Sequence, residues 1–461
     1  MKDLKKEINH EQVDVERVSE KLSKAIRIPT IAKLDEEGFD WTEFDKFHKF
    51  LEDEFPLVHK TLKREVIARA DLVYIWEGSD PSLLPIAFLS HQDVVPVTEG
   101  TEGDWEHPAF AGEIADGYIW GRGAIDMKNQ LVSVMESIET LLEEGYKPVR
   151  SVYLCFGHNE EIMSEKNSGA MNIVAEMQKR GIRFDSIIDE GGAMFPFSVP
   201  HILDMVLVGI GVGEKGYADY KVTVKGKGGH SSAPPDHSAI GELAKKIERF
   251  EKHQFKAEMP DYFMELIVSV CNRLAFPLNG LAKVVPTLKP IITYAMTKEP
   301  QGATFIRSCQ AVTMCQGSPA SNVLPQRASA TINFRLVQGT TLKDIEKKLE
   351  KYMGGKNVEI ERLEGREPKP LSPSDSRSFK TIKALMEESD SRYIVTPFLV
   401  MGGTDAYHYQ DICDNVYRFG PYEVSVEVMM TAHSTNERVP VESLAKGVAF
   451  FKSYIRRMTA E

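Results

Sequence analysis

One stretch of the sequence, residues 149–156, restricts the fold more than any other. It is a nearly continuous apolar run, which is typical of a strand buried on both faces at the centre of a parallel sheet. Apolar residues recur at helical spacing before it, in 131–142, and residues 168–180 predict a second helix after it. Strands that alternate with helices predict an α/β fold with a mostly parallel sheet.

Histidine or acidic residues follow three of the predicted strands. In chain order, the three strands end in His91 and Asp93, in Glu160 and Glu161, and in Asp189 and Glu190. Each pair alone is weak support for a site, because such residues are also common at solvated turns. The carboxyl ends of parallel strands lie at one edge of a sheet, where ligands bind. We therefore expect these side chains to converge.

Two more candidate residues lie in loops. Asp126 belongs to the glycine-rich loop 121–128 that precedes a helix, and helix capping explains an aspartate there equally well. His433 lies in a loop after the predicted strand 415–419. The five cysteines are scattered and lack Cys-x-x-Cys spacing, so a bound metal would have imidazole and carboxylate ligands, which suit zinc or manganese.

These residues could form a site for two metal ions. The candidate ligands are His91, Asp126, Glu161, one of Asp189 and Glu190, and His433. Two cations held close together lower the pKa of a shared water, polarise a carbonyl group and stabilise the resulting oxyanion. The remaining glutamate, Glu160, would take a proton from that water and pass it to a leaving amine. Asp93 would hydrogen-bond the His91 imidazole and fix its tautomer.

Length and charge restrict the domain count and the partners. A chain of 461 residues is too long for one ordinary core and predicts two domains. The net charge of −12 disfavours nucleic acid and anionic membranes as partners. The charged N-terminus lacks the apolar core of a signal peptide, and no apolar stretch reaches the length of a spanning helix. We therefore expect a cytoplasmic protein with neither nucleic-acid nor membrane partners.

The pattern changes near residue 213. Alternating strands and amphipathic helices follow, at 217–224, 239–250, 328–336, 341–352 and 358–362. This order predicts a compact sheet with helices on one face. We therefore assign residues 213–368 to an inserted domain, and residues 1–212 and 369–461 to a catalytic domain. The pattern does not resolve the middle of the insertion, residues 259–301.

Seven short motifs, in order over nearly the whole chain, resemble those of the co-catalytic zinc peptidase family of aminoacylase, glutamate carboxypeptidase and carboxypeptidase S. They are His91-x-Asp93, Gly121-Arg122-Gly123-Ala124-x-Asp126-x-Lys128, Glu160-Glu161, Asp189-Glu190-Gly191-Gly192, Gly229-His230-Ser231-Ser232, Asn322-Val323-Leu324-Pro325 and His433-x-x-Asn436-Glu437. The resemblance implies a catalytic domain interrupted by an α+β, ferredoxin-like lid that also serves dimerisation. It further implies two zinc ions, for which manganese or cobalt could substitute.

The resemblance also implies a role for each residue of the metal site. Asp126 would bridge the two ions. The other ligands would divide into one site with His91 and Glu190, or Asp189 in its place, and a second site with Glu161 and His433. Glu160 would be the general base, and Asp93 the partner of the imidazole. We prefer Glu190 to Asp189 as the ligand.

Five further residues would bind substrate by the same resemblance. His230 on the lid would donate to the oxyanion, often in the site of a neighbouring subunit, which implies a homodimer. Asn322 and Arg335 on the lid, with Gly403 and Thr404 near the site, would hold the polar end or carboxylate of the substrate. Without the resemblance, an arginine at the end of an alternating strand is more often the partner of a surface ion pair, and only the match of Asn333-Phe334-Arg335-Leu336 makes the two explanations equal.

The first functional hypothesis is therefore hydrolysis of an amide bond beside a free carboxylate, in a dipeptide, a C-terminal peptide or an N-acyl amino acid. One position departs from the family pattern, because Asn159 stands where an acid is usual; we expect little effect, since it is not a ligand. A second hypothesis is deacetylation or deamidation of a non-peptide substrate on the same metal site. A third is a non-catalytic scaffold, which would predict broken ligand sets, and none is broken here.

Overall fold

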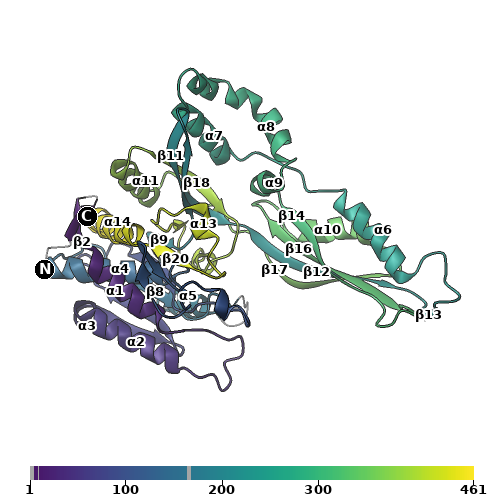
Figure 1. Cartoon of the computed structure of the whole chain (residues 1–461), viewed down its shortest axis with the longest axis horizontal. Coiled ribbons are helices and arrows are strands. Elements are labelled where there is room, and N and C mark those ends of the chain that lie inside the picture. The colour runs from purple at the N-terminus through teal and green to yellow at the C-terminus, as the bar shows by residue number, and fades with distance from the viewer. Residues whose placement is uncertain (1–4, 9, 163–167, 461) are drawn as a thin grey trace.

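The computed structural model describes residues 5–8, 10–162 and 168–460. Figure 1 shows two parts, a thick part that contains both chain ends and a narrow extension that ends at β13 (Gly229–His230). The predicted α/β class, with a catalytic part and an inserted part, is confirmed. Among the described residues, no helix combines the length and the apolar character that crossing a bilayer would require.

A nine-stranded sheet forms the centre of the thick part. Its strand order is β10-β11-β19-β9-β5-β8-β4-β3, with β18 beside β11. The strands are β3 (Lys63–Ile67), β4 (Asp71–Trp76), β5 (Ile86–His91), β8 (Val152–Gly157), β9 (Ser186–Asp189), β10 (Ala193–Val199), β11 (Leu203–Glu214), β18 (Tyr393–Val400) and β19 (Val416–Arg418). The central strands β8, β5, β9 and β19 run parallel, as predicted. Strands β3, β4 and β10 are antiparallel to their neighbours at the flanks.

Helices cover both faces of this sheet, which explains why its central strands are so apolar. Alternate side chains of a strand point to opposite faces. Phe88 of β5 packs edge-on against Phe451 and Tyr454 on one face, while Ala87 and Leu89 belong to the core on the other. The first face is covered by α1 (Val15–Ile26), α4 (Lys128–Glu143) and α14 (Val441–Thr459), and the second by α5 (Gly169–Lys179) and α12 (Ala406–Tyr409).

Smaller elements complete the thick part. They are β1 (Lys5–Ile8), β2 (Glu11–Asp14), α2 (Thr42–Glu54), α3 (Pro56–Thr61), η1 (Glu102–Asp104), β6 (Ile114–Ala115), β7 (Tyr118–Trp120), α11 (Arg377–Ser389), α13 (Val426–Met429) and β20 (Arg438–Pro440). Strand β20 pairs with β7, and this pairing brings the C-terminal loop of His433 to the loop that follows β7 and carries Asp126.

A four-stranded antiparallel sheet forms the extension, with the order β14-β16-β12-β17. Its elements in chain order are β12 (Gly216–Lys225), α6 (Ala239–Glu251), β14 (Cys309–Gln316), β16 (Arg327–Leu336), α10 (Leu342–Met353) and β17 (Val358–Arg366). The succession β-α-β-β-α-β and this strand order are those of a ferredoxin-like unit, as expected. We call this sheet with α6 and α10 the lid. Its strands lie within the predicted insertion, 213–368, whose bounds stay a prediction.

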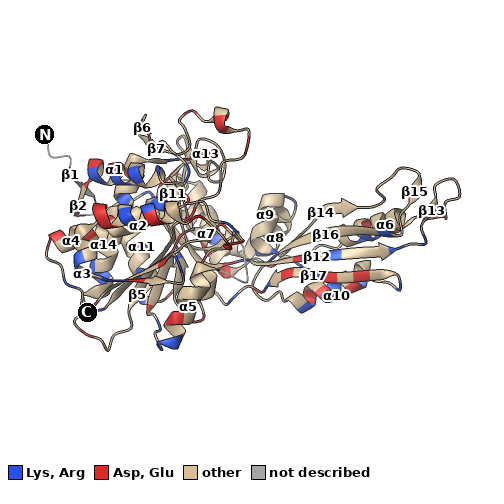
Figure 2. Cartoon of the chain, turned by 90° about the horizontal axis from the view of Figure 1, so that it is seen from below, with Lys and Arg blue, Asp and Glu red and all other residues tan. Residues whose placement is uncertain are grey.

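The segment that the sequence pattern did not resolve leaves the lid. It forms α7 (Asp261–Arg273), η2 (Leu278–Lys283), η3 (Val285–Leu288), α8 (Lys289–Met296) and α9 (Pro300–Ile306). Helix α7 packs beside β18 and β11 of the large sheet, and Ala275 N donates a hydrogen bond to Ile202 O at 2.9 Å. In Figure 1, α7 and α8 form the top edge of the molecule. Figure 2 shows that α1 and α10 carry both basic and acidic residues, as helices that face solvent do.

Candidate metal centre

Three parallel strands bring the predicted ligands together. Strands β8, β5 and β9 are neighbours and run in the same direction, so their carboxyl ends meet at one edge of the sheet. His91 is the last residue of β5, Glu160 and Glu161 follow β8, and Glu190 follows β9. The convergence predicted from strand order therefore occurs.

Asp126 lies between two imidazoles. His91 Nε2 is 3.2 Å from Asp126 Oδ1 and 3.4 Å from Glu190 Oε1. His433 Nε2 is 3.0 Å from Asp126 Oδ2 and 3.0 Å from Glu161 Oε2. Each oxygen of Asp126 thus faces a different histidine with its own glutamate, which is the arrangement of a carboxylate that bridges two cations.

The donor atoms are close enough to bind metal. His91, Asp126 and Glu161 offer donor atoms within 4.8 Å of one another, and so do His91, Glu160 and Glu190. The set has oxygen and imidazole nitrogen donors and no thiolate, a composition that zinc, manganese and cobalt accept. The residues present therefore fit a divalent-metal centre.

The acid–base properties of these groups point the same way. Burial raises the pKa of Glu190 to about 8, and the charge of Asp126 adds to this rise. Burial, and then the charge of Glu190, raises the pKa of Glu160 well above its usual range. Hydrogen bonds to Asp126 and Glu161 raise the pKa of His433 to about 10. Protons thus offset the crowded negative charge, and a divalent cation would replace them, because its ligands bind it deprotonated.

Asp93 holds two parts of the site at once. Its carboxylate accepts hydrogen bonds from the backbone amides of Glu160 and Glu161, both at 3.1 Å. His91 Nδ1 lies 2.9 Å from the backbone oxygen of Asp93 and 3.4 Å from its carboxylate. Asp93 therefore fixes the turn of the two glutamates as well as the ring of His91.

Asp189 and Glu190 face different partners. The Asp189 carboxylate accepts a hydrogen bond from the backbone amide of Ala406 at 2.7 Å and is fully buried. Glu190 is the acid of this pair that reaches His91. Geometry therefore favours Glu190 as the ligand and gives Asp189 the task of anchoring α12.

Glu437 is a residue whose importance the sequence motif did not reveal. Its Oε1 accepts hydrogen bonds from the backbone amides of Gly123, Ile125 and Asp126 at 2.9, 3.0 and 3.2 Å, and its Oε2 pairs with Arg122 Nη1 at 2.5 Å. Both side chains are buried. Its place in the motif His433-x-x-Asn436-Glu437 was its only signal in the sequence. It fixes the loop that aims Asp126 between the histidines.

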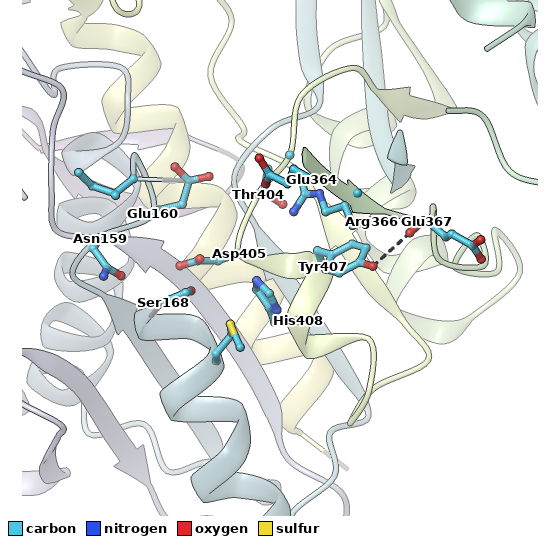
Figure 3. A pocket seen from close by; sticks show the side chains of 14 residues that line it. Asn159, Glu160, Ser168, Glu364, Arg366, Glu367, Thr404, Asp405, Tyr407 and His408 are labelled. Atoms are coloured by element: carbon cyan, nitrogen blue, oxygen red, sulfur yellow. Dashed lines mark hydrogen bonds between the residues drawn. The ribbon is translucent and has the colours of Figure 1, made fainter. Parts of the chain in front are cut away.

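A polar cavity of about 420 Å³ opens beside the metal cluster. Figure 3 shows Glu160, Thr404 and Arg366 around it, so the thick part and the end of β17 both contribute. The Arg366 guanidinium lies over the Tyr407 ring at 4.8 Å, and a Cβ on Gly403 would collide with it. Its Nε is buried without a hydrogen-bond partner among the described residues. Arg366 belongs to none of the sequence motifs, so its place at the cavity is known only from the structure.

A second, largely apolar cavity of about 220 Å³ includes Asp126 and Glu190 in its lining. Its other lining residues are mostly apolar, among them Ile125, Met127, Met194, Tyr422, Val424 and Met429. Methionine side chains adapt to ligands of varied shape. The metal cluster is therefore in contact with one polar and one apolar cavity.

Three of the predicted substrate residues lie away from the metal cluster and the polar cavity. His230 and Asn322 meet at the far end of the lid, where Ser231 N donates to Asn322 O at 3.1 Å and both side chains are exposed. Figure 1 shows β13 at the opposite end of the molecule from the large sheet. Arg335 lies on β16 with its guanidinium over the Tyr217 ring at 4.7 Å and does not line the polar cavity. Gly403 and Thr404 do line it.

Comparisons with known proteins agree on one family. The profile of peptidase family M20/M25/M40 matches residues 87–457. The chain is 34% identical to the probable carboxypeptidase S-like 2 of Dictyostelium discoideum, over 96% of this chain and 85% of that protein. It is 33% identical to the N-fatty-acyl-amino acid synthase/hydrolase PM20D1 of Mus musculus, over 95% and 87%. The fold matches that of an M20 family metallo-carboxypeptidase from Sulfolobus solfataricus, with a TM-score of 0.69 at 19% identity, over 96% and 99% of the two chains.

Proposed function

The chain belongs to peptidase family M20/M25/M40, a family of metal-dependent hydrolases, and from this membership we propose that it cleaves the amide bond of N-acyl amino acids or short peptides beside a free carboxylate. Family membership supports a divalent metal, and we propose two zinc ions. The observation that carries the proposal is that Glu160 lines the polar cavity and also lies beside the metal cluster.

We assign the two metal positions to the two imidazoles. His91 and Glu190 would hold one ion, His433 and Glu161 the other, and Asp126 both. When bound, the ions would lower the pKa of a water between them and draw electron density from the substrate carbonyl. Glu437 keeps Asp126 in place, because three backbone amides and Arg122 hold its carboxylate in turn.

Glu160 is the proposed general base and acid. Its backbone amide donates a hydrogen bond to the Asp93 carboxylate, which holds the Glu160 backbone in place at the wall of the cavity. It takes a proton from the attacking water and gives this proton to the amine that leaves. Glu161, its neighbour, is occupied with His433 and serves as a ligand instead.

One cavity is polar and the other is apolar, and this difference supports a substrate with a carboxylate on one side of the amide bond and an apolar group on the other. In the polar cavity, the Arg366 guanidinium pairs with the buried Glu214 at 3.5 Å, and Thr404 donates to the same carboxylate. The guanidinium would bind a substrate carboxylate through its remaining nitrogens. Burial, and then the charges of Arg366 and Lys369, lower the pKa of His408 to about 4, so this imidazole is neutral and the positive charge of the cavity lining comes from Arg366. The apolar cavity suits an acyl chain or an apolar side chain on the other side of the bond. The names of the relatives, a carboxypeptidase and an N-fatty-acyl-amino acid hydrolase, agree with this division.

We further propose that the enzyme is a homodimer. His230 and Asn322 lie at the exposed end of the lid, away from the metal cluster of their own chain. This position supports a role in the site of a partner subunit, where His230 would donate to the oxyanion. A protruding arm that completes a neighbour's site is a reciprocal contact, as a two-fold dimer requires.

The test is a set of matched substrates with added zinc, manganese or cobalt. N-acetyl and N-octanoyl forms of one amino acid would be compared with the same compounds amidated at the carboxylate. We expect turnover of the free acids, at least about 100-fold higher kcat/KM than for the amides, and a gain with the longer acyl chain. Equal turnover of acids and amides would favour the alternative, a deacetylase or deamidase that does not read a carboxylate.

A further inference from the structure

Large apolar side chains are exposed along the segment that leaves the lid. Leu281, Val284, Leu288, Ile291 and Tyr294 follow one another along η2, η3 and α8 at spacings of three or four residues. All five are exposed, Ile291 and Tyr294 by 64% and 65%. We call these five residues the apolar stripe.

Some apolar residues of this segment are buried within the protein, whereas the residues of the apolar stripe are exposed. Ala282 and Val285 are buried, and Ile292 packs in a small cluster with Met264 and Val285. An amphipathic helix of a globular protein normally buries its apolar side and exposes its polar side. Here further apolar side chains are exposed, on a segment that forms the top edge of the molecule in Figure 1. Apolar surface of this kind marks an interaction site.

The exposed surface continues on neighbouring elements. Phe276, just before η2, is 88% exposed, the highest value among the large apolar side chains of the described residues. Phe197, Val199 and Ile202 are exposed around the hairpin of β10 and β11. The hydrogen bond from Ala275 N to Ile202 O ties this hairpin to the segment of the stripe.

The charge of the segment is opposite to that of the chain. Residues 274–298 contain Lys283, Lys289 and Lys298 and no acidic residue, within a chain of net charge −12. Lys289 pairs with Asp261 at 2.9 Å, and Glu299 follows Lys298, whose ammonium lies over the Tyr294 ring at 4.7 Å. The excess of positive charge on the segment is therefore small, and Lys283 and Lys298 supply it. The expectation that the protein avoids anionic membranes rested on total charge, which does not describe this edge.

We propose that the apolar stripe docks on the surface of a bilayer that contains anionic lipid. Lysines beside exposed Leu, Ile, Phe and Tyr side chains are the composition of interfacial segments that lie in the plane of a membrane. A second copy of residues 274–298 would bring further lysines and no acidic residue to the contact, whereas anionic headgroups supply the opposite charge. The contact is peripheral, and it is independent of the proposed reaction.

The experiment is co-sedimentation of the whole protein with two kinds of vesicle, one of phosphatidylcholine alone and one that also contains about 30% phosphatidylglycerol. The second lipid is anionic and attracts lysines. We expect binding to the mixed vesicles that weakens with added salt. Leu288→Ser, Ile291→Ser and Tyr294→Ser combined should lower the partition coefficient at least about tenfold. Lys283→Glu with Lys298→Glu should weaken binding to the mixed vesicles only.

Matched controls separate the stripe from general effects. Val66→Ser, Leu84→Ser and Ile114→Ser remove three similarly exposed apolar side chains far from the stripe in sequence, and they should leave binding unchanged. Lys347→Glu with Lys351→Glu on α10 controls for charge. Hydrolysis of a soluble substrate reports that each variant is folded. The proposal is overturned if the wild type does not bind mixed vesicles, or if the stripe variants turn a dimer into a monomer while vesicle binding persists.

Discussion

At the scale of single residues, two adjacent glutamates do different work because a turn directs them apart. Asp93 ties both of their amides, Glu161 faces His433, and Glu160 faces the polar cavity. The sequence could predict that the pair matters, since it follows a strand too apolar for a surface. The same reasoning could not separate Asp189 from Glu190, because only the contact of Asp189 with Ala406 in another segment decides which acid faces His91.

Glu160→Gln should lower kcat at least about 1000-fold and leave the metal content unchanged, because the amide cannot accept the proton and the residue is not assigned as a ligand. Glu161→Gln is the matched variant, and it should lose one of the two ions. Elemental analysis of purified protein, with kcat on an N-acyl amino acid, measures both effects. Loss of metal from Glu160→Gln as well would show that Glu160 binds an ion and would remove it as the base.

Glu437→Gln should lower the free energy of unfolding by about 3 kcal/mol, because it leaves the buried Arg122 guanidinium without its counter-charge. Urea unfolding measures this change, and zinc titration should show weaker binding since the loop of Asp126 loses its anchor. Glu427→Gln is the control, because the Glu427 side chain is 83% exposed, so its pair with Arg438 is worth less than about 1 kcal/mol. Similar losses in the two variants would contradict the anchoring role.

At the scale of elements, the order of strands and helices could be predicted more fully than the contacts between distant ones. Apolar runs and helical spacing predict β5, β8, β9 and the helices between them, because these patterns are local. The pairing of β20 with β7 and the packing of α7 beside β18 join segments that are far apart in the chain. No local pattern predicts such contacts, and the role of Arg366 at the end of β17 depends on one of them.

The position of β13 leads to a test by complementation. Alone, His230→Ala and Glu160→Ala should each be almost inactive. When the two variants are refolded together, half of the dimers are mixed, and each mixed dimer has one intact site if His230 acts on the partner. We therefore expect about a quarter of the wild-type activity. A mixture that stays inactive while mixed dimers form would place His230 in its own chain.

At the scale of the whole molecule, the proposed metal centre joins five separate parts of the sequence. The residues that we assign as ligands come from β5, the loop before α4, the end of β8, the end of β9, and the loop before β20. Removal of metal by EDTA should therefore lower the stability of the thick part as a unit. At zinc concentrations 100 times the Kd, each site adds about 2.7 kcal/mol. Thermal unfolding with and without zinc measures this, and His91→Ala with His433→Ala should abolish the response.

The chain passes from the thick part into the lid and back again, and this path determines which of the two can fold first during translation. All strands of the lid, from β12 to β17, come from one continuous segment, so the lid has its complete set of pairings as soon as that segment leaves the ribosome. The large sheet must wait, because β11 and β9 pair with β18 and β19, which are made after the lid. During translation the lid can fold first, while the unfinished sheet edge is exposed to chaperones or aggregation until β18 and β19 emerge.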